Sequence, residues 1–204
     1  MKRASSYLKE ATKLKKEKKY LEAIKMLDKA YEVGLPGDTT DDPNTPIEII
    51  VNNVISIQDL LRKAMYLQLA GKSKEGFKYL ENLKNSCLKK YDETGDLYYL
   101  EPDLFLQIGR FLDKEKKYVL ALKNRSISYL IDSFLPYINS LKMNMKNDDH
   151  LRRGNKDFIK NYFKKYYKNI KNFEVDKFAN LMSYAHKFDK KKLQASNIKK
   201  IENF

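Results

Sequence analysis

Apolar residues recur along the chain at helical spacing, and three segments repeat the same order of large and small side chains. In each segment a small residue precedes a leucine by three positions; the small residues are Ala11, Ala64 and Gly109. A second small residue follows that leucine by nine positions; these residues are Ala23, Gly76 and Ala121. Antiparallel helices pack closely where small side chains lie at their crossing. The pattern therefore predicts three helical hairpins, near residues 4–37, 57–90 and 102–135.

This order of positions resembles the tetratricopeptide repeat (TPR), a helix-turn-helix unit of about 34 residues. The segment KKYLEAIKMLDKAYEVGLP (18–36) is similar to the second helix and the end of that repeat. The third segment departs from the family at Arg125, where the repeat usually has an aromatic residue or leucine. The resemblance implies an all-α fold of TPR-like antiparallel helical hairpins in a short superhelical array with extra C-terminal helices.

Insertions separate the three segments. The first includes GDTTDDPNTP (37–46), which is rich in turn-forming residues. Thr45 and the residues after it form a capping-box pattern, with Pro46 at the first helical position. The pattern predicts a long helix from near Pro46 to about Ala70. The second insertion, Tyr91–Pro102, is interpreted as a loop, and Pro136 is expected to end or kink the helix that begins near Tyr118.

The last quarter of the chain does not follow the repeat. An apolar stripe predicts a helix over 156–172, a second helix is expected over Val175–Phe188, and a short one follows from Ala195. We therefore divide the chain into a TPR-like region, 1–145, and a basic, aromatic C-terminal helical extension or cap, 146–204. Solenoid repeats require terminal caps.

Charge and composition narrow the class of protein. The formal net charge is +14, and the basic excess is concentrated at the two ends of the chain. A single cysteine, Cys87, leaves no internal disulfide and fits a reducing compartment. The sequence shows neither a secretory signal nor a transmembrane segment, so a cytoplasmic location is expected.

No catalytic motif stands out in the sequence. It has no phosphate-binding glycine loop, no nucleophile motif and no metal-ligand spacing, and the two histidines are isolated. We therefore expect neither an enzyme, nor a metal site, nor a cofactor.

The resemblance implies a binding surface on the first helix of each hairpin, which lines the concave groove of a TPR array. The residues at these positions are Leu8, Thr12, Leu61, Met65, Leu106 and Arg110. Three equivalent leucines would form an apolar stripe that suits a peptide or a partner helix. The chain's own C-terminal helices, or its long second helix, are alternative occupants. The expected function is a non-catalytic protein-binding scaffold or adaptor, chaperone-like or regulatory.

The basic C-terminal segment is the rival surface. It interleaves lysines with phenylalanine and tyrosine, a combination that binds phosphates and stacks on bases. The lysines that would contact an acidic partner or nucleic acid are Lys160, Lys164, Lys168 and Lys171. An ordinary packed surface helix shows the same pattern. Nucleic-acid association and structural self-association as a homo-oligomer therefore stay open as alternatives.

Overall fold

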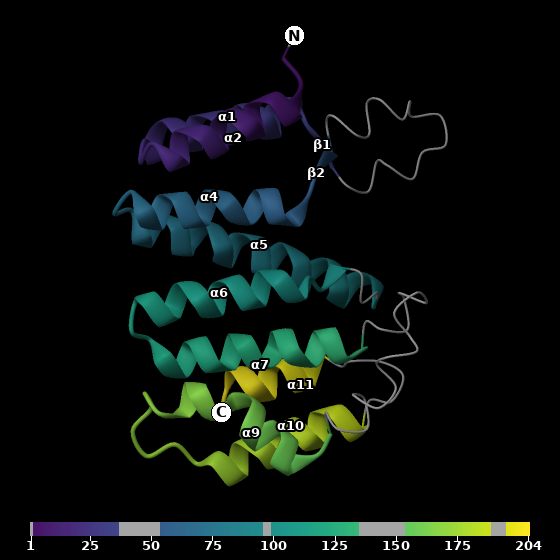
Figure 1. Cartoon of the computed structure of the whole chain (residues 1–204). Helices are drawn as coiled ribbons and strands as arrows, with labels where there is room; N and C mark the ends of the chain where they lie inside the picture. Colours follow the sequence, from purple (N-terminus) through teal and green to yellow (C-terminus); the bar gives the residue numbers. More distant parts are fainter. Residues whose placement is uncertain (1, 37–53, 96–98, 135–153, 189–194) are drawn as a thin grey trace. The chain divides into compact units, whose positions relative to one another are not determined.

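The structure is a computed structural model, and it describes residues 2–36, 54–95, 99–134, 154–188 and 195–204. These residues form an all-α fold (Figure 1). The helices are α1 (Ala4–Lys16), α2 (Tyr20–Val33), α4 (Ile57–Leu69), α5 (Ser73–Thr94), α6 (Pro102–Lys114), α7 (Tyr118–Phe134), α9 (Lys156–Tyr167), α10 (Val175–Phe188) and α11 (Ala195–Glu202). Two short parallel strands, β1 (Leu35–Pro36) and β2 (Val54–Ile55), join the ends of the first insertion.

The chain divides into two compact units, Met1–Asn82 and Leu83–Phe204, and α5 contributes residues to both. Unit 1 contains α1, α2, α4 and the first part of α5. Unit 2 contains the rest of α5 and all later helices. The boundary expected from the sequence near residue 145 lies outside the described residues.

The three hairpin turns have the same backbone geometry. The residues with positive φ are Lys18 (61°), Gly71 (78°) and Lys116 (59°). In each turn the next amide donates to the carbonyl of the repeated leucine, at 2.9 Å in the first and third turns and 2.8 Å in the second; the pairs are Lys19–Leu14, Lys72–Leu67 and Lys117–Leu112. A second bond within each turn completes a Schellman motif, which ends a helix and reverses the chain.

All six small residues of the repeated pattern are buried; they are Ala11, Ala23, Ala64, Gly76, Gly109 and Ala121. Helices α1 and α2 pack against each other, and so do α6 and α7. For the first and third hairpins, the burial of these residues agrees with their predicted role at helix contacts.

The prediction of one long helix from near Pro46 to Ala70 is wrong. Helix α4 begins at Ile57, and the residues before it form strand β2. The hydroxyl of Ser56 accepts a hydrogen bond from the Asp59 amide at 3.2 Å, and the Asp59 carboxylate accepts one from the Ser56 amide at 3.1 Å. This capping box satisfies the free amides of the first turn and sets the start of the helix. The box expected at Thr45 lies outside the described residues.

Two other expected boundaries also need correction. Helix α5 continues through Tyr91 to Thr94, so the second insertion is not a loop over its whole length. Helix α9 ends at Tyr167 rather than near 172. Ile170 and Phe173 lie beyond it but still pack against the core of unit 2. Helix α7 is described as far as Phe134, close to the expected end before Pro136, and α10 has the expected bounds.

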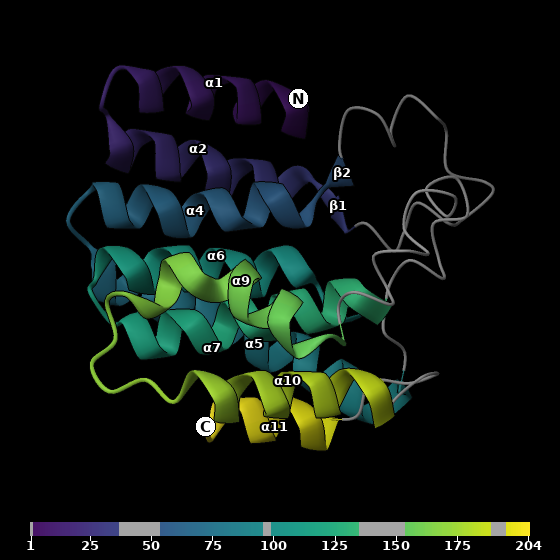
Figure 2. The same cartoon turned by 60° about the horizontal axis from the view of Figure 1, so that its bottom comes forward.

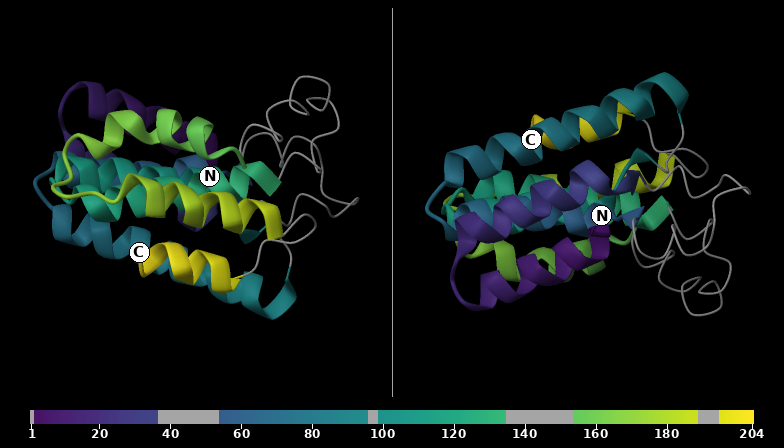
Figure 3. Two further views of the ribbon diagram at one scale, coloured as in Figure 1. Left: turned by 90° about the horizontal axis from the view of Figure 1, so that it is seen from below. Right: turned by 90° about the horizontal axis from the view of Figure 1, so that it is seen from above.

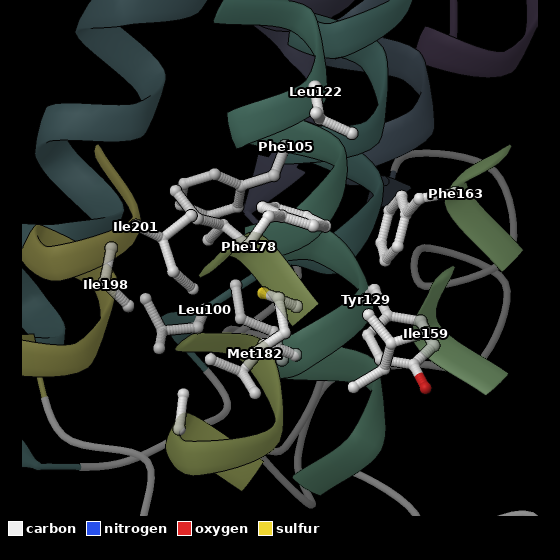
Figure 4. Packing of buried hydrophobic residues seen from close by; sticks show 14 of the residues in the cluster. Leu100, Phe105, Leu122, Tyr129, Ile159, Phe163, Phe178, Met182, Ile198 and Ile201 are labelled. Atoms are coloured by element: carbon white, nitrogen blue, oxygen red, sulfur yellow. The ribbon is translucent and has the colours of Figure 1, made fainter. Parts of the chain in front are cut away.

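The C-terminal helices belong to the core of unit 2. Helices α9, α10 and α11 all contact α7 (Figure 2). Figure 4 shows Phe178 of α10 between Phe105 on one side and Met182 on the other. Its ring meets that of Phe163 edge-on, with centroids 5.4 Å apart. These contacts make the C-terminal segment a packed part of the fold.

An ion pair links helix α11 to the second part of α5, and the two helices overlap in both views of Figure 3. The ammonium group of Lys84 lies 3.4 Å from the Glu202 carboxylate. Lys123 of α7 donates to the Glu202 backbone carbonyl at 2.8 Å. The side chains of Ile198 and Ile201 are buried in the unit 2 core. The last helix therefore connects two other helices of this unit.

Candidate functional site

The first helices of two successive hairpins meet in unit 1. Leu8 and Met65 are half-buried, and both pack against one buried cluster that includes Ala11 and Tyr66. The Thr12 hydroxyl donates to the Leu8 carbonyl at 2.9 Å. Four residues of α1 and α4 thus lie together, and Leu8 and Met65 keep part of their apolar surface open to solvent.

Leu61 is more buried than Leu8 and Leu106, the other two leucines of the expected stripe. Only 3% of its surface is exposed, so its side chain packs in the interior of the protein and is not available to a partner. Leu69, one turn beyond Met65 on α4, is 42% exposed. The spacing of four residues from Met65 is the sequence signal that could have identified it. On α4 the exposed apolar surface therefore runs from Met65 to Leu69. We call Leu8, Thr12, Met65 and Leu69 the groove residues, after the concave groove that the resemblance to a TPR array leads us to expect there.

The two remaining expected groove positions are in unit 2. Leu106 of α6 is half-buried and Arg110, one turn later, is exposed. Both belong to the first helix of the third hairpin, as Leu8 belongs to that of the first. They repeat the combination of a half-buried leucine and an accessible residue one turn later.

The C-terminal lysines have different surroundings. Lys160 is paired with Asp176 of α10, and the hydrogen bond to that carboxylate raises the pKa of its ammonium group. Lys164, Lys168 and Lys171 are exposed. The first lysine therefore holds α9 to α10, and the other three leave positive charge at the surface.

The aromatic residues between those lysines are largely occupied by the fold. Phe163 is buried. The guanidinium group of Arg125 covers the ring of Tyr166, with 4.5 Å between the guanidinium carbon and the ring centroid. The ring of Tyr167 stacks on that of Phe173. Tyr162 remains half-exposed but contacts Tyr129. Base stacking thus has few free aromatic faces on α9, although the charge is present.

A cleft that the sequence analysis did not identify lies within unit 1. It is an open depression of about 620 Å³ between α2, α4 and the first turns of α5. Helix α2 contributes Leu21, Ile24, Lys25 and Asp28, whose spacings of three and four place them on one face. That face could be recognised in the sequence, but the helices opposite it could not.

The described residues contain no group of three or more histidine, cysteine, aspartate or glutamate side chains that could hold a metal ion. Within the same residues, every helix is too short or too polar to span a membrane.

Cys87 is a free thiol, and burial raises its pKa.

Comparison of the chain with models of known protein families, with curated proteins and with solved structures found no significant match.

Proposed function

We propose that the chain is a non-catalytic, TPR-like scaffold of the cytoplasm that binds a peptide or partner helix along the first helices of its hairpins. The observation that carries this proposal is the pair Leu8 and Met65. They come from first helices of successive hairpins, rest on the same buried cluster and keep part of their surface exposed.

This arrangement suits a partner with one apolar face. Half-buried side chains lose little entropy on binding, because packing beneath already restricts their rotamers. Met65 adds a polarisable thioether, which makes favourable contacts with apolar and aromatic partners. Leu69 extends the surface by one helical turn, which matches the spacing of contacts along an amphipathic helix. The three equivalent Schellman turns support hairpins of one kind.

The test replaces Leu8 and Met65 together by glutamate in the full chain. Because both side chains are half-buried near the surface, a carboxylate can reach water while it removes the apolar contact. The matched control is Leu120→Glu, since Leu120 is 46% exposed on α7 and lies outside the groove residues. Circular dichroism checks that both variants stay helical.

Affinity capture from the native host, followed by mass spectrometry, gives the readout. We expect the unaltered chain and the Leu120→Glu variant to retain the same protein partner, and the groove variant to lose it. Equal retention by all three would refute the groove. Comparing nuclease-treated with untreated lysates separates the alternative, because a partner lost after nuclease treatment is held through nucleic acid.

A further inference from the structure

The cleft between α2, α4 and α5 is a separate surface from the groove. On α4, Lys63 and Leu67 line the cleft. At 100° per residue, Met65 lies about 200° around the helix from Lys63. The two surfaces are therefore on opposite sides of α4, and a ligand of one does not occupy the other.

The cleft combines an apolar floor with an exposed leucine. Ile24 and Leu67 are 8% and 7% exposed and belong to the buried cluster of unit 1. Leu21, also in the lining, is 53% exposed. A large leucine left open beside an apolar floor gains contact area when another apolar side chain enters.

The charged residues of the lining leave a positive excess. Lys63 lies 2.5 Å from the Asp28 carboxylate, and Lys72 lies 3.0 Å from that of Glu75. These two pairs neutralise both acidic residues of the lining. Lys25 and Lys78 also line the cleft, and neither has an ion-pair partner in the part of the chain that the structure describes. Two ammonium groups are thus available to an incoming anion.

Tyr79 adds a hydrogen-bond donor. The ammonium group of Lys63 lies 5.4 Å from its ring centroid. Burial, together with the charge of Asp28, raises the pKa of Tyr79 to about 12. A tyrosine hydroxyl keeps its proton at neutral pH even at the ordinary pKa of 10.0, so that of Tyr79 can donate to a carboxylate.

We propose that this cleft binds an acidic amphipathic peptide segment, with an apolar side chain against Ile24, Leu67 and Leu21 and carboxylates beside Lys25 and Lys78. A small free anion would satisfy the lysines but would leave Leu21 exposed. An uncharged apolar ligand would cover the leucine but leave the ammonium groups without a partner. Charge and apolar contact together select a segment that carries both.

The probe is a fluorescein-labelled peptide of about twelve residues, with leucines at i and i+4 and glutamates beside them, measured by fluorescence anisotropy with the full chain. Two control peptides replace the glutamates by glutamine or the leucines by alanine. The cleft variant is Lys25→Glu with Lys78→Glu. Its matched control is Lys9→Glu with Lys15→Glu, which makes the same change of charge at exposed positions of α1.

We expect saturable binding that weakens at least about tenfold in the cleft variant and with either control peptide, while the α1 variant differs by less than about threefold. Three outcomes would overturn the proposal. Binding that survives the alanine peptide shows a site for anions alone. An equal loss in both charge variants shows general attraction to a basic protein. A loss in the Leu8 and Met65 variant, with none in the cleft variant, assigns the peptide to the groove instead.

Discussion

A Cβ atom added to Gly109 would lie 2.8 Å from the Cγ of Arg125, so the absence of a side chain on α6 makes room for the arginine of α7. The guanidinium group pairs with Asp113 of α6 and stacks over the ring of Tyr166 of α9. Only 11% of the arginine side chain is exposed. One residue thus joins the third hairpin to the C-terminal helices.

Gly109→Ala should lower the free energy of unfolding by about 1–2 kcal/mol, although alanine normally favours a helix over glycine. The added methyl would press on the fixed stem of Arg125 and come within 3.1 Å of the Ala121 carbonyl. Urea denaturation measures the change. The same substitution in an Arg125→Ala background should cost less, because the stem is gone. An equal cost in both backgrounds would contradict the contact.

Arg125→Ala should itself cost about 3 kcal/mol, because it leaves the carboxylate of Asp113 without its partner and removes the cover of Tyr166. Arg110→Ala on the same hairpin is the matched control. Arg110 is exposed, and its loss should change the free energy of unfolding by no more than about 0.5 kcal/mol. Similar effects of the two substitutions would refute the special role of Arg125.

Glycine should have opposite effects on stability at two positions near the third hairpin turn. Lys116 has φ of 59°, a conformation that costs a non-glycine residue energy. Lys116→Gly should therefore stabilise the chain by about 0.5 kcal/mol, after allowance for the greater freedom of glycine in the unfolded state. Lys114→Gly, at the last position of α6, should destabilise it by a similar amount. Thermal unfolding of both variants tests the sign.

The raised pKa of Tyr79 should make the folded chain less stable against unfolding at high pH. Its pKa is about 12 in the folded chain, against an ordinary value of 10.0. Because the folded state holds this proton more tightly, the free energy of unfolding should fall as pH rises from 10 to 12. Tyr79→Phe has no proton to lose, so its decline over that interval should be shallower. Parallel denaturation curves at several pH values make the comparison; identical slopes would count against the shift.

The last helix should contribute strongly to unit 2. Ile201→Ala removes a fully buried side chain from the core and should cost about 2–4 kcal/mol. Lys199→Ala, on the exposed side of α11, is the control and should be close to neutral. Chemical denaturation followed by circular dichroism gives both values. A neutral Ile201 variant would mean that α11 is dispensable for this unit.

The hairpins were predictable because their signals are local. The positions of Ala11 and Ala23 relative to Leu14 follow from contacts within one helix pair, and the same order returns at Gly109 and Ala121. The signal that starts α4 is also local, but the sequence offers two of them. The capping box at Ser56 and Asp59 competes with a similar pattern at Thr45, and the apolar run between the two patterns resembles a continuous helix.

By itself, then, the sequence determined the all-α class and the approximate position of most helices, because helix periodicity acts over a few neighbouring residues. Only the tertiary structure decided that Leu61 is buried while Leu69 is exposed, that Arg125 reaches Tyr166, and that Lys25 and Lys78 face one cleft. Those relationships join residues far apart in the chain. Their geometry depends on how whole helices pack, which no local pattern records.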